Sequence, residues 1–276
     1  MTTDLRTGRL PVPGADLYYD VSGEGPPLVL VPGGGGDAGV FDAMRPLLDE
    51  HHTVISYDPR CCSRSTEHDP ATQDVAVHAD DVRRLIEHTA EGPVRLFGTS
   101  AGAIVGLAAA RDRPGLFKRT VLHEPPLFEL LPDAESHRAM VDRTVELFHA
   151  EGPGPAMAHF GEANGPEESP EPVAPRLSGE AATRLAGNTE AFLARTLPSF
   201  TRYLPDLDSL PSTGITVGVG RNSRNQTAGR AAVELARRLG SDPVVFPGGH
   251  LGTVEHPERF ARLLLDLLNG APSRPS

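Results

Sequence analysis

The residue whose type and setting most clearly indicate chemistry is Ser100, at the centre of the run Gly98-Thr99-Ser100-Ala101-Gly102. This G-x-S-x-G pattern follows an apolar segment typical of a buried strand, Val94–Phe97, and opens an almost wholly apolar stretch typical of a buried helix, Ala101–Arg111. A sharp turn from strand to helix exposes a serine hydroxyl at the head of the helix, where it can attack a carbonyl carbon. The sequence therefore predicts Ser100 as a nucleophile.

A serine nucleophile requires a base, and His250 is the candidate. It lies in the loop Pro247-Gly248-Gly249-His250-Leu251, after a short apolar strand and before the last helix, so we expect it at the same edge of the sheet as Ser100. Of the 11 histidines it alone has this position. We interpret His123 as a packed strand-end residue, and we expect the helical histidines to be solvated (His78, His88 and His149).

The glycine run Pro32-Gly33-Gly34-Gly35-Gly36 follows the first expected parallel strand. Glycines let backbone amides approach a developing oxyanion without obstruction from side chains. We expect the oxyanion donors to be the amides of Gly34 and Ala101, with Gly33 and Gly35 against the substrate.

The same loop has a second interpretation. Gly34, Gly36 and Gly39 match the G-x-G-x-x-G fingerprint of dinucleotide-binding folds, and Asp58 ends the next expected strand. Against it, Asp37 places a carboxylate where a pyrophosphate would bind, and the fingerprint leaves Ser100 and His250 unexplained.

Several segments together resemble the α/β-hydrolase superfamily over essentially the whole chain. The resemblance implies an α/β fold with a mostly parallel central sheet flanked by helices, and hydrolysis of a carboxylic ester or lactone through an acyl-enzyme. A narrower resemblance, to lactone hydrolases of the zearalenone-lactonase type, rests on Gly36-Asp37 with Phe41-Asp42 and on Val121–Pro125. The segments behind the broad resemblance are Val31–Gly36, Tyr57–Arg60, Ser63–Ser65, Gly98–Gly102 and Gly248–His250.

The chain departs from the common superfamily pattern at the acid. Most members carry it after the seventh strand, where this chain has Asn222 and Ser223, and neither can offset the charge of an imidazolium. Glu124 follows the sixth strand, where haloalkane dehalogenases and zearalenone-type lactonases place theirs, so the resemblance implies Glu124 as the acid. The alternative for Glu124 is a structural ion pair with Arg60 or Arg64.

The amide at position 222 also motivates a second functional hypothesis. A chain without the usual acid could be a non-hydrolytic biosynthetic enzyme, such as a cyclase or acyltransferase, or a ligand-binding protein, because a fold does not fix a function.

These residues must be positioned by alternating strands and helices, the pattern of a mainly parallel sheet. We expect a core of residues 1–124 and 211–276, interrupted by a helical cap (lid) at residues 125–210 that contains a loop at Gly161–Pro175. Expected strands are Arg9–Val12, Asp16–Val21, Leu28–Val31, Thr53–Tyr57, Val94–Phe97, Thr120–His123, Ile215–Val219 and Val244–Phe246. Expected helices are Val40–Glu50, Val75–Thr89, Ala101–Arg111, Ala134–Ala150, Ala156–Phe160, Gly179–Thr196, Ala228–Leu239 and Pro257–Leu268.

The cap is expected to roof the pocket and to select the substrate. Because the chain has no Trp, its aromatic walls must come from other rings, joined by Leu251 beside the base. The candidate rings are Phe128, Phe148, Phe160, Phe192, Phe200 and Tyr203.

The composition of the chain restricts the classes of molecule that it is expected to bind. A formal net charge of −11 disfavours nucleic acids and anionic membrane surfaces. Met1–Leu10 has no signal-peptide core, and adjacent Cys61 and Cys62 read as free thiols, so we expect a cytoplasmic protein. No metal-ligand spacing occurs, so we expect neither metal nor cofactor, only a small-molecule substrate. A homodimer is left open.

Overall fold

A computed structural model describes residues 5–68, 73–165, 179–210 and 214–270. Its nine-stranded sheet has the order β1-β2-β4-β3-β6-β7-β8-β9, with β5 paired to β2. Strands β3, β4 and β6 to β9 pair in parallel, whereas β1, β2 and β5 are antiparallel. The strands are β1 (Arg6–Val12), β2 (Ala15–Ser22), β3 (Pro27–Val31), β4 (Thr53–Tyr57), β5 (Thr66–Glu67), β6 (Val94–Thr99), β7 (Phe117–His123), β8 (Ile215–Gly220) and β9 (Val244–Phe246).

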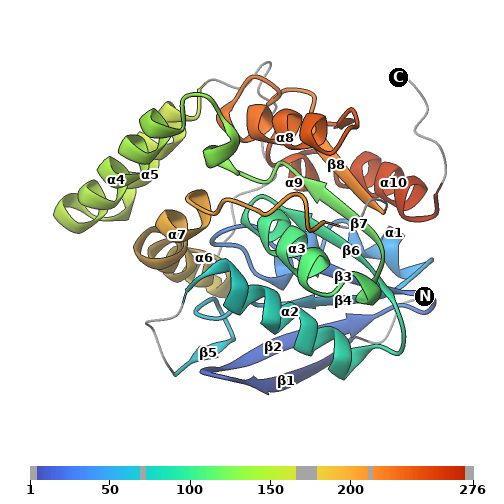
Figure 1. Ribbon diagram of the computed structural model, residues 1–276. Helices are drawn as coiled ribbons and strands as arrows, with labels where there is room; N and C mark the ends of the chain where they lie inside the picture. Colours follow the sequence, from blue (N-terminus) through green and yellow to red (C-terminus); the bar gives the residue numbers. More distant parts are fainter. Residues whose placement is uncertain (1–4, 69–72, 166–178, 211–213, 271–276) are drawn as a thin grey trace.

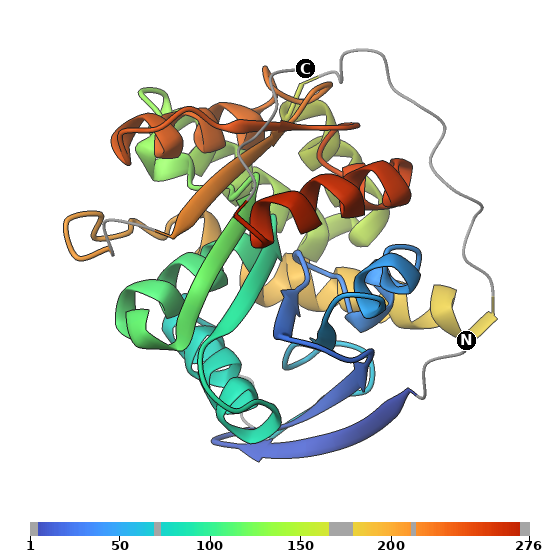
Figure 2. The same cartoon turned by 90° about the vertical axis from the view of Figure 1, so that its right-hand side faces the viewer.

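Two helical layers cover the sheet (Figures 1 and 2). Helices α2 (Val75–Thr89), α3 (Ala101–Asp112) and α8 (Thr227–Arg238) form one apolar core with one face. Helices α1 (Arg45–Asp49) and α10 (Pro257–Leu268) form a second core with the other, and α9 (Gly252–Glu255) precedes α10. Helix α3 is buried almost all round, as its apolar circumference predicts.

The parallel register aligns the carboxyl ends of the central strands. Gly98 of β6 pairs with Val31 of β3, and Thr99 of β6 pairs with His123 of β7. His123 in turn pairs with Gly218 of β8. The residues that follow β3, β6, β7 and β8 therefore meet at one edge of the sheet.

Between β7 and β8 the described residues form helices and turns but no strand. These are η3 (Phe128–Leu130), α4 (Ala134–Glu151), α5 (Pro153–Ala163), α6 (Gly179–Ala191), a π-helical turn (Phe192–Thr196) and α7 (Leu197–Thr201). Figure 1 shows α4 to α7 gathered on one side of the molecule. Most of the loop expected at Gly161–Pro175 lies outside the described residues, and Gly161–Ala163 belong to α5.

Two expected helices differ in the structure, and in each a proline supplies the reason. The single helix expected at Val40–Glu50 is a 3-10 turn, η1 (Ala38–Phe41), followed by the five-residue α1, which Pro46 opens. The helix expected at Gly179–Thr196 ends at Ala191 and continues as the π turn, where the Leu197 amide donates to the Phe192 carbonyl. Pro198, which has no N–H, then starts α7.

Candidate active site

Ser100 lies at a strained turn between β6 and α3. Its φ is 54° and its ψ −126°, a conformation rare for residues with a side chain. The flanking glycines permit the turn, because a Cβ on Gly98 would lie 2.5 Å from the Gly102 carbonyl oxygen and one on Gly102 would lie 2.3 Å from the Val31 oxygen. The Ser100 amide donates to the His123 carbonyl at 2.8 Å, which ties the turn to the end of β7.

His250 lies between Ser100 and Glu124. Its Nε2 is 3.0 Å from Ser100 Oγ, and its Nδ1 is 2.6 Å from Glu124 Oε2. The loop that carries it is held by Glu255, whose carboxylate accepts from the Gly249 amide at 2.7 Å. These contacts join three residues that are far apart in the sequence into one hydrogen-bonded chain.

Glu124 is fully buried, directly after β7, and has a positive φ of 47°. Its Oε1 accepts from the Gly220 amide at 2.8 Å and from Ser223 Oγ at 2.5 Å. Burial by itself raises the pKa of Glu124, but the hydrogen bonds from His250 and Ser223 and the charges of His250 and His123 outweigh it. The pKa of Glu124 consequently lies below its ordinary value.

The arginines considered as partners of Glu124 are engaged elsewhere. Arg60 pairs with Asp81 through two 2.7 Å hydrogen bonds, and Arg64 holds Asp58 at 2.7 and 2.8 Å. Asp58, the acidic residue of the dinucleotide interpretation, also accepts from the Ala38 amide at 3.0 Å. Its carboxylate is thus occupied in holding the glycine loop.

Sequence reasoning missed Ser223 as a contributor, because it weighed only the charge of that side chain. The hydroxyl is fully buried and donates to the carboxylate of Glu124. Neighbouring glycines make the room: a Cβ on Gly220 would lie 2.5 Å from Ser223 Oγ, and one on Gly229 would lie 2.1 Å from the Ser223 carbonyl oxygen. A serine flanked by such glycines after a strand is the signal that could have indicated this role.

The glycine loop after β3 lies beside Ser100. A Cβ on Gly33 would be 3.0 Å from the Ser100 Cβ and 3.7 Å from its Oγ. Ala101 is the first residue of α3, so its N–H is one of the helix N-terminal donors that have no partner within the helix. Gly34 lies in the same loop, where a Cβ would approach the Phe192 ring to 2.5 Å.

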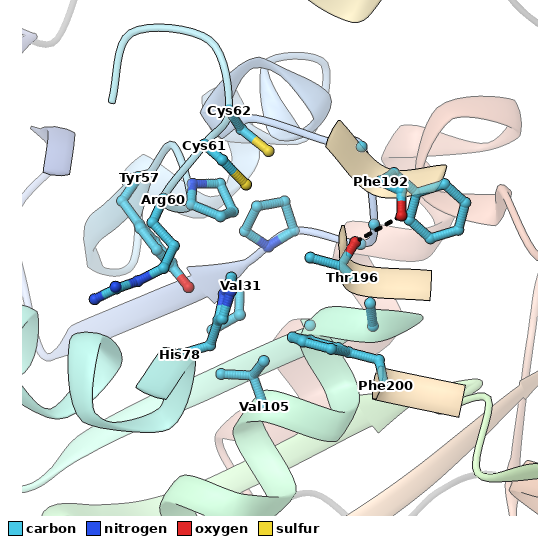
Figure 3. Close-up of a pocket in the computed structure, with 17 residues that line it drawn as sticks. Val31, Tyr57, Arg60, Cys61, Cys62, His78, Val105, Phe192, Thr196 and Phe200 are labelled. Carbon is cyan, nitrogen blue, oxygen red and sulfur yellow. Dashed lines mark hydrogen bonds between the residues drawn. The ribbon is translucent and has the colours of Figure 1, made fainter. Parts of the chain in front are cut away.

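A small cavity of about 20 Å³ opens beside this loop (Figure 3). Six of the predicted residues line it: Gly33, Gly34, Gly35, Ala101, Phe192 and Phe200. The other residues predicted to contact substrate lie outside its lining: Phe128 packs in the helical segment between β7 and β8, Tyr203 contacts Arg111, and Leu251 is exposed beside His250.

Cys61, Cys62 and His78 also line the cavity, and the sequence analysis gave none of them a place there. The expectation that His78 is solvated is wrong. Its side chain is buried, its Nε2–H donates to Gln73 Oε1 at 2.8 Å, and burial lowers its pKa to about 3. Its spacing from Val75 and Val82 places it on the buried face of α2, a signal that was available. His123 is packed between Phe246 and Phe260, as predicted.

The described residues contain no group of three or more His, Cys, Asp or Glu arranged to hold a metal ion. In that same part of the chain no helix combines the length and apolarity needed to cross a membrane.

The strand–serine–helix turn and the buried carboxylate beside the histidine define a class that comparison with known proteins supports. Residues 28–263 match the model of the "Alpha/beta hydrolase family". The chain is 31% identical over 265 residues to the uncharacterized hydrolase YraK of Bacillus subtilis, covering 96% of both chains. It is 26% identical to the zearalenone hydrolase of Cladophialophora bantiana, over 95% of this chain and 96% of that one.

The carboxylesterase CesB (YbfK) of Bacillus subtilis is similar in structure, with a TM-score of 0.72, 16% identity, and coverage of 97% of this chain and 92% of that chain. The chain belongs to the alpha/beta hydrolase family and is a hydrolase. The fold and the resemblance to the α/β-hydrolase superfamily that the sequence predicted are confirmed.

Proposed function

We propose that the protein hydrolyses a carboxylic ester or lactone of a small organic molecule through an acyl-enzyme. One observation carries this proposal: the continuous hydrogen-bonded chain from buried Glu124 through His250 to Ser100 Oγ. It has the order and polarity that nucleophilic acyl transfer requires. The names of the related zearalenone hydrolase and carboxylesterase are consistent with ester or lactone cleavage.

In the proposed mechanism, Ser100 Oγ attacks the substrate carbonyl while its proton passes to His250 Nε2. The amides of Gly34 and Ala101 donate to the oxyanion that forms. His250 then returns the proton to the leaving alcohol oxygen, and the alcohol departs. A water molecule attacks the acyl group by the same steps, releasing the acid and restoring the Ser100 hydroxyl. Glu124 holds the His250 tautomer and stabilises its imidazolium.

We further propose that residues 125–210 act as the cap over this site. Two contacts support it: Asn188 of α6 accepts from the Ser63 amide at 2.7 Å, and Arg184 of α6 donates to Asp37 at 3.3 Å. Both reach from the segment between β7 and β8 to loops that surround the glycine run. The non-hydrolytic alternative loses its motivation, since Glu124 lies within hydrogen-bond distance of His250 without help from position 222.

The nucleophile is tested by Ser100→Ala, assayed on p-nitrophenyl esters. The variant should keep the wild-type melting temperature and lose about 10³-fold or more in kcat. The matched control is Ser209→Ala, which removes a hydroxyl that donates to Asp206 on the surface and should leave kcat unchanged. A folded Ser100→Ala enzyme with near wild-type turnover would refute the proposed function.

A further inference from the structure

The cavity beside the glycine loop lies next to Ser100, although Ser100 is not part of its lining. Gly33, on which a Cβ would lie 3.0 Å from Ser100 Cβ, and Ala101, the next residue in the chain, both line it. It then runs between the first turns of α3, at Val105, and the loop after β4, at Pro59. A substrate whose carbonyl carbon is bonded to Ser100 Oγ, with its oxygen toward Gly34 and Ala101, would direct one of its two substituents into this space.

The walls of this cavity are mainly apolar, and several of their polar groups are engaged, whereas Arg60 Nη1 is buried without a hydrogen-bond partner among the described residues. Thr196 Oγ1 donates to the Phe192 carbonyl at 3.2 Å, and His78 Nε2 is 2.8 Å from Gln73. Burial raises the pKa of Tyr57, which keeps its phenol neutral. In Figure 3 the guanidinium of Arg60 lies at the opposite side from Phe192. Such walls favour a hydrocarbon group over a charged one.

The cavity is also small, and aromatic rings form part of its wall. Its volume of about 20 Å³ holds about one water-sized group. Phe200 of α7 is 4% exposed, and Figure 3 shows its ring beside Val105 with the thiols of Cys61 and Cys62 across the cavity. Its ring packs on His78 at a centroid distance of 5.1 Å. A longer chain would have to displace this ring or that of Phe192.

We propose that this cavity binds the acyl side of the substrate and restricts the enzyme to esters of short acyl groups, of two or three carbons. The inference rests on the proposed function, because it takes Ser100 as the acylated residue. Phe200 and Phe192 are then the residues that determine specificity, since their rings form the wall contributed by α7 and the π turn.

The test compares kcat/KM for p-nitrophenyl acetate, butyrate and octanoate. Wild type should prefer acetate to butyrate by about tenfold, because overpacking a filled site costs a factor of that order. Phe200→Ala and Phe192→Ala should each move the preference toward butyrate by about tenfold. Phe148→Ala, which removes a ring of α4 outside the cavity lining, should leave the preference unchanged.

A binding measurement separates this inference from the proposed function. Methyl-, propyl- and heptylboronic acid form a reversible bond from boron to the serine oxygen and place the alkyl group where the acyl group would lie. Thermal shifts that fall as the alkyl chain lengthens in wild type, and not in Phe200→Ala, support the pocket. Equal or rising shifts with length, or an octanoate rate equal to that of acetate, overturn the pocket and leave Ser100 as nucleophile. No shift and no turnover with any probe overturns both.

Discussion

The ends of the neighbouring strands β7 and β8 contribute different groups to the surroundings of His250. The end of β7 supplies the carboxylate, Glu124, which is fully buried and contacts His250. The end of β8, where the superfamily pattern led us to expect the acid, supplies two donors to Glu124 Oε1: the Gly220 amide and the Ser223 hydroxyl. Asn222 is half-buried beside them, and its backbone N–H donates to the Gly248 carbonyl.

In the proposed mechanism, the carboxylate lies at the end of β7 and the donors that satisfy it lie at the end of β8. His250 Nδ1 needs a buried anion at hydrogen-bond distance, and the ends of two adjacent parallel strands can both reach it. A buried carboxylate is costly unless donors satisfy it. Once the carboxylate is on β7, the end of β8 supplies those donors.

The largest expected effect on kcat distinguishes the contribution of β7 from that of β8. Glu124→Gln should lower kcat by about 10⁴-fold, because an amide cannot stabilise the imidazolium, whereas Asn222→Ala should change kcat only mildly. The measurement is kcat for both purified variants, with thermal melts to establish that each is folded. A small loss of kcat in Glu124→Gln with a large loss in Asn222→Ala would mean that the orienting residue lies at the end of β8. Small losses of kcat in both variants would mean that another residue orients His250.

A smaller effect is expected from the donor on β8. Ser223→Ala removes one of two hydrogen bonds to Glu124 Oε1 and leaves the one from Gly220, so kcat/KM should fall about tenfold. Because this bond helps to lower the pKa of Glu124, its loss should shift the acid limb of the pH–rate profile toward higher pH. A tenfold loss with an unmoved acid limb would mean that Ser223 acts only in packing.

The smallest expected effect concerns stability at the end of β7. Burial lowers the pKa of His123 to about 4, from 6.5 for the free side chain. As the pH falls below 6.5 the unfolded chain takes up a proton that folded His123 refuses, so stability is lost between pH 6.5 and about 4. His123→Phe should reduce the fall in melting temperature over that range, and His149→Phe, at an exposed position, should not. Equal acid sensitivity in both variants would contradict this assignment.

Local signals made the fold and two of the site residues predictable. Gly98 is required by a backbone contact within the turn, since a Cβ there would meet the Gly102 carbonyl, whereas Gly102 is required by the carbonyls of Val31 and Pro32. The local spacing of the two glycines nevertheless indicates the position of Ser100 in the sequence. His250 follows from its place between a strand and a helix. Most central strands were predicted within one or two residues, because an apolar run bounded by turn residues is a local pattern.

Other features depend on partners that are distant in the chain. The bond from Ser223 to Glu124 spans 99 positions, and no local pattern records it. The π turn at Phe192 arises where Pro198 cannot continue the bonding of α6, and the turn places Phe192 against Gly34. Which rings line the cavity follows from that turn, and therefore Phe128 and Tyr203 could not be separated from Phe192 beforehand.

The central claim is that Ser100 carries an activated hydroxyl, and covalent labelling tests it most directly. The wild-type protein is incubated with a fluorophosphonate probe, digested, and the modified residue is mapped by mass spectrometry. We predict a single modification, at Ser100, that is abolished in Ser100→Ala and strongly slowed in Glu124→Gln. A protein that stays unlabelled while folded, or that is labelled at another residue with Ser100 untouched, would contradict the proposed function.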